Sequence, residues 1–152
     1  MKIGIIKEGK EPIDRRVPLI PEQCLELMKI HPQLSLVVQS STIRCYGDQD
    51  YKNKGIEIVE DLSDCDLIMG VKEVPLKLLI PNKKYLFFSH TIKQQPYNKN
   101  LLKEILNKNI DLIDYEVLKD SNGDRIIGFG RYAGIVGAYN AFLTYGLKEK
   151  KY

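Results

Sequence analysis

Residues 67–73 read Leu-Ile-Met-Gly-Val-Lys-Glu, and residues 85–90 read Tyr-Leu-Phe-Phe-Ser-His. Each stretch is a short, nearly continuous apolar run that ends in polar or charged side chains. Such runs are typical of strands buried on both faces of a parallel sheet. Further apolar runs at 3–6, 34–38, 57–59 and 110–113 alternate with helical patterns over 21–30, which begins at Pro21, and over 100–108. In the second of these helices we expect four apolar side chains to point inward, namely Leu101, Leu102, Ile105 and Leu106. Strands that alternate with helices predict an α/β domain with a mostly parallel sheet.

The C-terminal part of the chain has a different pattern. Asn122-Gly123 separates the stretches 115–118 and 125–129, and this dipeptide is the strongest short-range signal for a β-hairpin. A helix is predicted over residues 131–147. Small residues recur on one side of it (Gly130, Gly134, Gly137 and Ala141).

Each glycine inside a helix costs about 1 kcal/mol relative to alanine. We therefore expect the small-residue stripe to be a packing seam, so that Gly137→Leu would destabilise the fold by about 1–3 kcal/mol. A phosphate-binding loop is the alternative. However, the glycines between Gly128 and Gly134 miss the G-x-G-x-x-G spacing by one residue.

Composition excludes several classes of protein. The chain has 152 residues, of which 43% are hydrophobic and 28% charged, as expected for one globular domain. A net charge of +3 is too small to indicate a nucleic-acid partner. No apolar run reaches the length of a membrane span, and the N-terminus lacks a signal-peptide core. Cys24, Cys45 and Cys65 form neither a metal motif nor a disulfide framework, so we expect three free thiols and a cytoplasmic protein.

Titratable side chains follow four of the predicted strands, as Lys7-Glu8, Lys72-Glu73, Ser89-His90 and Asp114-Tyr115-Glu116. In open α/β sheets, ligands bind outside the carboxyl ends of the strands. A lysine, a histidine and a carboxylate that meet there can shift one another's pKa and supply acid–base chemistry. The alternative is that these charges only mark where each strand reaches water.

Two residues, one at a strand end and one in the loop that follows the first strand, carry the functional hypothesis. His90 is either a structural histidine or a catalytic one, and the nearby Lys93 together with Lys72 favours catalysis. Arg16 either clamps a substrate carboxylate through its two-pronged guanidinium or is a solvated surface arginine. The sequence contains no dinucleotide fingerprint, no Walker loop and no Cys/His metal cluster.

Five segments that span nearly the whole chain resemble a known family. The sequence is similar to the N-terminal domain shared by alanine dehydrogenase, nicotinamide nucleotide transhydrogenase and NAD-type saccharopine dehydrogenase. The likeness is greatest to saccharopine dehydrogenase and lysine–ketoglutarate reductase. The segments are 15–21, 69–73, 87–93, 112–116 and 129–134.

The resemblance implies a Rossmann-like (flavodoxin-like), mostly parallel sheet with flanking helices and a C-terminal hairpin. It also implies that residues 1–152 are the N-terminal substrate and catalytic domain of a two-domain dehydrogenase. The Rossmann domain that binds NAD or NADP is expected to be absent from this chain. No cofactor-binding residue and no metal ligand is therefore assigned here.

The resemblance also implies roles for individual residues. Lys72 matches the active-site lysine of the family and His90 its histidine, and we assign these two as the catalytic acid–base pair. Arg16 matches the arginine that holds a substrate carboxylate. Glu116 matches an acidic residue after the later strand, while Lys93 and Glu73 match neighbours in the saccharopine branch. Arg131, at the start of the last helix, is a further candidate anchor for substrate.

The implied activity interconverts lysine plus 2-oxoglutarate with saccharopine, using NAD(P)(H) in the full-length enzyme. The isolated domain is expected to be inactive and to need its missing Rossmann domain. Its other partners would be small-molecule substrates, with no nucleic acid and no membrane. The alternatives are a domain of an alanine-dehydrogenase-like enzyme and a stand-alone module that binds a ligand without catalysis.

Overall fold

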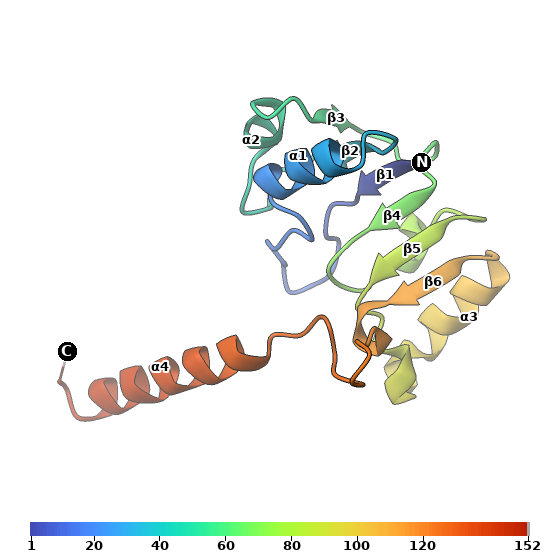
Figure 1. The fold of residues 1–152 in the computed structure, drawn as a ribbon. Coiled ribbons are helices and arrows are strands. Elements are labelled where there is room, and N and C mark those ends of the chain that lie inside the picture. The colour runs from blue at the N-terminus through green and yellow to red at the C-terminus, as the bar shows by residue number, and fades with distance from the viewer. Residues whose placement is uncertain (152) are drawn as a thin grey trace. The chain divides into compact units, whose positions relative to one another are not determined.

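Six parallel strands form one sheet in the order β3-β2-β1-β4-β5-β6 (Figure 1). The computed structural model describes residues 1–151 and divides into two units, Met1–Val117 and the segment from Leu118 onward. The strands are β1 (Lys2–Ile5), β2 (Ser35–Gln39), β3 (Glu57–Val59), β4 (Leu67–Met69), β5 (Lys84–Phe87) and β6 (Asp111–Asp114). The helices are α1 (Pro21–Ile30), α2 (Asp48–Lys52), α3 (Lys99–Asn107) and α4 (Gly130–Lys148).

The predicted α/β class is confirmed, and every pair of neighbouring strands is parallel. The strand order is that of Rossmann folds, in agreement with the predicted Rossmann-like class. It arises because the chain crosses from β3 at the edge back to β4 beside β1. A local apolar pattern identifies a strand but does not determine which strand it pairs with.

The sheet has a separate hydrophobic core on each face. Cys24 of α1 and Tyr51 of α2 pack with Ile5 and Val38 on one face. Leu101 and Ile105 of α3 belong to the other core, which also contains Val37, Ile68 and Phe87. Because successive side chains of a strand point to opposite faces, Val37 and Val38 belong to different cores.

One helix buries less than its sequence predicts. In α3, Leu101 and Ile105 are buried, but Leu102 and Leu106 are 44% and 70% exposed. The first two lie four residues apart on one stripe, and the other two form the adjoining stripe, about 100° further round the helix. The prediction that all four point inward is therefore wrong for Leu102 and Leu106.

The second unit confirms one turn and one helix, and it contradicts the predicted seam. Residues 115–117, at the end of the first unit, form a 3₁₀ turn instead of a strand. The predicted hairpin is reduced to a single antiparallel bridge between Lys119 and Arg125. In α4, a Cβ atom added at Gly134 or Gly137 would meet no atom within 4 Å. The packing-seam prediction is therefore wrong for the described residues, as is the overpacking expected of Gly137→Leu.

No helix among residues 1–151 is long and apolar enough to cross a membrane.

Candidate active site at the carboxyl ends of the strands

The candidate site lies beyond neighbouring strands of the sheet. Because β1, β4, β5 and β6 are parallel, their carboxyl ends meet at one edge (Figure 1). The register pairs Met69 of β4 with Leu86 of β5, and Phe87 of β5 with Asp114 of β6. The residues that follow these strands therefore come together, although they are far apart in the sequence.

Glu8 ties the end of β1 to the end of β4. Its two carboxylate oxygens accept hydrogen bonds from the backbone N–H groups of Val71 at 2.7 Å and Lys72 at 2.9 Å. Burial raises the pKa of the Glu8 carboxyl, although these two hydrogen bonds oppose that shift. Glu8 thus fixes the backbone that carries Lys72. Sequence reasoning placed Glu8 at a strand end but gave it no function.

His90 lies between a lysine and a carboxylate. Its Nε2 atom is 3.1 Å from the Lys72 amine nitrogen, and its Nδ1 atom is 3.1 Å from Oε2 of Glu116. Burial pushes the pKa of Glu116 upward, but hydrogen bonds from His90 and Lys93 outweigh it, and the pKa lies below its usual value. An ionised carboxylate only accepts hydrogen bonds, so Nδ1 of a neutral His90 carries the hydrogen. Nε2 then presents its lone pair to Lys72.

Two carboxylates flank His90, and each forms an ion pair with a lysine other than Lys72. Lys93 lies 3.0 Å from Oε1 of Glu116, and Lys10 lies 2.6 Å from Oε2 of Glu73. The other oxygen of Glu73 is buried without a hydrogen-bond partner, 3.8 Å from Nε2 of His90. The site therefore alternates positive and negative groups around the imidazole. Sequence reasoning did not find Lys10, which lies in a loop and not directly after a strand.

An aromatic wall closes one side of this cluster. The Phe88 ring stacks on the His90 ring with the centroids 6.2 Å apart, and it also contacts the Tyr115 ring at 5.1 Å. The Lys72 amine lies 5.9 Å from the centroid of the Phe88 ring, within cation–π range. An apolar wall lowers the local dielectric, which strengthens the electrostatic interactions of the neighbouring charges.

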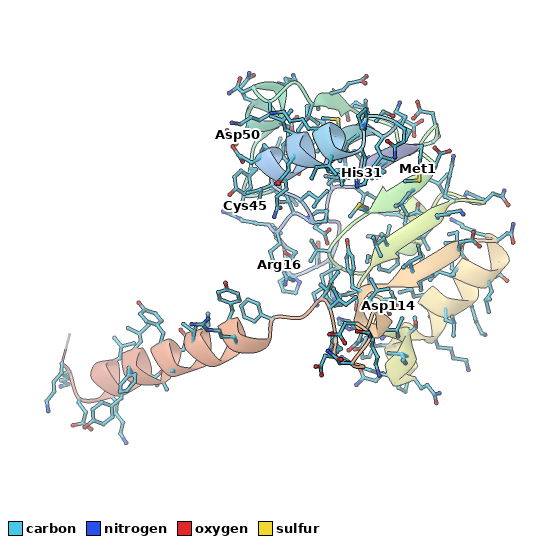
Figure 2. The ribbon with its side chains drawn as sticks, in the orientation of Figure 1. Met1, Arg16, His31, Cys45, Asp50 and Asp114 are labelled. Carbon is cyan, nitrogen blue, oxygen red and sulfur yellow. The ribbon has the colours of Figure 1, made fainter. Side chains whose placement is uncertain are left out.

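Arg16 lies at the same edge of the sheet but has a different partner. It belongs to the loop between β1 and α1 (Figure 2). Its Nε atom donates to Oδ1 of Asp14 at 2.9 Å, and its terminal nitrogen pairs with the other carboxylate oxygen of that residue. The hydrogen bond from Arg16 lowers the pKa of Asp14. With 58% of its side chain exposed, Arg16 can exchange Asp14 for an incoming carboxylate.

The structure thus brings together most of the residues that the sequence singles out. Lys72, His90, Glu116, Glu73 and Lys93 form one connected cluster, and Arg16 is held separately. Arg131 lies in the second unit, at the start of α4, and its role in substrate binding stays a prediction.

The remaining expectations concern metals and thiols. Among residues 1–151, no group of three or more His, Cys, Asp or Glu side chains could hold a metal ion. The prediction of free thiols is confirmed for all three cysteines, of which Cys24 and Cys65 are buried and Cys45 is exposed.

Several known proteins are similar to this chain. It is 41% identical to the alpha-aminoadipic semialdehyde synthase of Arabidopsis thaliana over 98% of its length, which is 14% of that protein. It is 29% identical to the saccharopine dehydrogenase [NAD(+), L-lysine-forming] of Yarrowia lipolytica over 98% of its length and 41% of that protein. The chain therefore spans less than half the length of these relatives.

Comparison with solved structures and family models agrees with the fold. An L-alanine dehydrogenase superimposes with a TM-score of 0.65 at 20% identity, covering 82% of this chain and 35% of that one. The model of the alanine dehydrogenase/PNT N-terminal domain matches residues 4–136. A match over that much of the chain establishes the relationship. The chain belongs to the alanine dehydrogenase/PNT N-terminal domain family.

Proposed function

We propose that this chain is the substrate-binding part of a dehydrogenase that interconverts lysine plus 2-oxoglutarate with saccharopine. The observation that carries the proposal is a chain of two contacts through the His90 ring. Its Nε2 atom lies 3.1 Å from the Lys72 amine, and its Nδ1 atom lies 3.1 Å from the Glu116 carboxylate. The similarity to an alpha-aminoadipic semialdehyde synthase and to saccharopine dehydrogenases supports the choice of substrates.

The cluster supplies two groups for proton transfer. Cleavage of saccharopine requires water to add to an imine, after which the carbinolamine nitrogen must gain a proton before it leaves. With the hydrogen on Nδ1, Nε2 of His90 takes a proton from the attacking water once the Lys72 ammonium turns from Nε2 to the substrate nitrogen. The Lys72 ammonium then donates a proton to that nitrogen, and the carbon–nitrogen bond breaks. The neutral Lys72 amine takes the proton of the carbinolamine hydroxyl as the carbonyl forms. Glu116 stabilises the imidazolium that forms in between, as a carboxylate partner of a general base does.

The positive charges of the site are suited to an acidic substrate. Saccharopine carries three carboxylates, whereas alanine carries one. Arg16, Lys72 and Lys93 lie at or near the carboxyl edge, and each is half-buried or exposed. Each charge-assisted hydrogen bond contributes roughly 1.5–3 kcal/mol, so one additional anchor changes affinity by about ten- to a hundredfold.

The described residues do not fit a bound dinucleotide. In a Rossmann domain a tight glycine turn joins β1 directly to a helix whose N-terminus holds the pyrophosphate. Here residues 6–20 separate β1 from α1, and the Glu8 carboxylate lies beside the end of β1. We infer that NAD or NADP is held elsewhere in a longer protein and supplies the hydride transfer. Calorimetric titration of this chain with NADH and NADPH should show no micromolar binding.

A chimaeric enzyme tests the proposed reaction. The chain replaces the segment that it matches in the Arabidopsis relative, and oxidation of NADH and NADPH is followed with lysine plus 2-oxoglutarate. We expect turnover with this pair and none with pyruvate plus ammonia. The matched control is the same chimaera with Lys72→Met, which keeps the length of the side chain but removes its proton.

Two results would overturn the proposal. A preference for pyruvate plus ammonia would assign the chain to an alanine-dehydrogenase-like reaction. A folded chimaera that binds saccharopine, by calorimetry, but turns over neither substrate pair would indicate a module that binds without catalysis.

A further inference from the structure

We propose that Asp114 is a positioning residue that, together with Ser89, sets the His90 ring against Glu116. Asp114 is the last residue of β6 and lies at the carboxyl edge of the sheet (Figure 2). Its carboxylate bonds to the Ser89 hydroxyl and the Glu116 backbone, and not to Lys72 or the His90 ring. Its consequence for turnover rests on the proposed function, but its effect on the His90 ring does not.

The two oxygens of Asp114 bind the ends of two neighbouring strands. Oδ2 accepts the hydroxyl of Ser89, which follows β5, at 2.5 Å. Oδ1 accepts the backbone N–H of Glu116, two residues after Asp114 itself, at 2.8 Å. One carboxylate therefore fixes the residue before His90 and the backbone of Glu116 at the same time.

Ser89 passes this constraint on to the other side of His90. Its hydroxyl oxygen accepts the backbone N–H of Thr91 at 3.1 Å and lies 2.8 Å from the Thr91 hydroxyl. Because the only proton of the Ser89 hydroxyl goes to Asp114, the Thr91 hydroxyl must donate to Ser89. The residues on both sides of His90 are thus tied to Asp114.

His90 needs such a constraint because its backbone is in an unusual conformation. Its φ angle is 55°, in the left-handed region that residues other than glycine seldom adopt. The buried Asn98 side chain donates to the His90 carbonyl at 3.1 Å. A conformation of this kind persists only when the surrounding contacts determine it. Here those contacts are the Asn98 side chain and the Lys93 backbone N–H on the His90 carbonyl, together with the Ser89–Asp114 pair.

The burial of this pair agrees with a specific role. Ser89 is fully buried and Asp114 is 6% exposed. A buried carboxylate is costly unless it is hydrogen-bonded, and an apolar pair of similar size would avoid that cost. What such an apolar pair lacks is an acceptor for the backbone N–H groups of Glu116 and Thr91. The carboxylate is therefore explained by the geometry that it imposes on His90 and Glu116.

NMR of the His90 ring tests the proposal on this chain. The ring ¹⁵N shifts at alkaline pH report which nitrogen carries the hydrogen, and the chain has two histidines, so the exposed His31 is an internal reference. We expect the Nδ1–H form in the wild type. In Asp114→Ala and Ser89→Ala, we expect averaged shifts that indicate both tautomers. Where Asp114→Ala melts too low for spectroscopy, Ser89→Ala decides.

Two further variants separate positioning from general loss of stability. Asp114→Asn should restore the Nδ1–H form, because its amide oxygen still accepts from Glu116 and its amide nitrogen can donate to Ser89. Asp111→Ala is the matched control, since Asp111 lies in the same strand but 75% of its side chain is exposed. It should leave the ring shifts unchanged. A folded Asp114→Ala or Ser89→Ala variant that keeps the wild-type tautomer overturns the proposal.

In the chimaeric enzyme the same variants should act on turnover. Misplacement of a catalytic group by about 1 Å costs up to about a hundredfold, so kcat should fall by roughly ten- to a hundredfold in Asp114→Ala with little change in KM. Asp114→Asn should recover most of that loss. If the chimaera lacks saccharopine turnover but the tautomer still depends on Asp114, the proposed function fails and the positioning of His90 stands.

Discussion

The two halves of the carboxyl edge hold their charged side chains in different ways. On the side of β4, β5 and β6, His90 and Glu116 have side chains that are 17% and 11% exposed, and hydrogen bonds join them to each other and to lysines. On the side of the loop after β1, the Arg16 side chain is 58% exposed and pairs with the Asp14 carboxylate in the same loop. The first arrangement is suited to proton transfer, which needs fixed distances. The second is suited to binding, because Arg16 can change its partner.

The strongest test of this difference removes the acid–base groups. His90→Ala and Lys72→Met should each lower kcat of the chimaeric enzyme by about 10²–10⁴-fold, as expected for loss of a general acid or base. His31→Ala is the matched control, because His31 is exposed at the end of α1, and it should leave kcat unchanged. Steady-state kinetics give the answer. Wild-type rates in both His90 and Lys72 variants would remove the proposed pair.

Variants in the loop after β1 should change KM more than kcat. Arg16→Ala should raise KM for the acidic substrate by about ten- to a hundredfold, with a smaller effect on kcat, because it removes a charge-assisted hydrogen bond. Arg15→Ala, at the exposed neighbouring position, should change neither value. A fall in kcat with an unchanged KM would place Arg16 with the proton-transfer groups.

Acid should weaken the interactions of Glu116. Its pKa is lower in the folded protein than the ordinary value of 4.5, so its contribution to stability is complete above that value. The contribution is lost as the pH falls through the folded pKa. Urea denaturation at a series of pH values should show a steeper acid loss of stability in the wild type than in Glu116→Gln. The difference in slope should be at most about 1.4 kcal/mol per pH unit. Equal slopes would contradict the ion pairing of Glu116.

The smallest expected effect is a difference in reactivity among the three cysteine thiols, which measures how exposed each one is. Cys45 is exposed and its backbone N–H bonds to the carbonyl of Arg15 in the loop after β1. Burial raises the pKa of Cys24 to about 12 and of Cys65 to about 11. A thiol reagent should therefore modify Cys45 rapidly in the native protein and all three cysteines after denaturation. The rapid phase should vanish in Cys45→Ser. Rapid reaction of two or more native thiols would show that a core is open.

Much of the fold could be predicted from local pattern. The apolar runs located all six strands within one or two residues, and Pro21 marked the start of α1. The sequence correctly predicted a turn at Asn122-Gly123. The two strands predicted on either side of it are absent from the described residues, because residues 115–117 form a 3₁₀ turn directly after β6. The glycine stripe of α4 was misread, since the sequence shows which residues share a helix face but not what lies against that face.

One rule about parallel sheets predicted where the candidate site lies, but it did not predict all of the contacts within the site. The rule that ligands bind at carboxyl ends selected Lys72, His90 and Glu116. It did not select Lys10 or the role of Glu8, whose contacts join residues more than 60 positions apart. Such contacts depend on how loops lie over the edge, and side-chain type alone does not specify this.

The sequence by itself determined which segments are strands and which polar side chains stand at their ends. These properties are local, because a continuous apolar run of a few residues indicates both the length of a strand and its burial on both faces. The tertiary structure alone decided that β4, β5 and β6 are neighbours, so that Lys72, His90 and Glu116 meet. It also decided that Nδ1 of His90 faces the Glu116 carboxylate and that Ser89, next to His90, donates its hydroxyl to the buried Asp114. Pairing of parallel strands joins segments across long crossovers, and the energy that selects it arises only when the whole sheet packs between its helices.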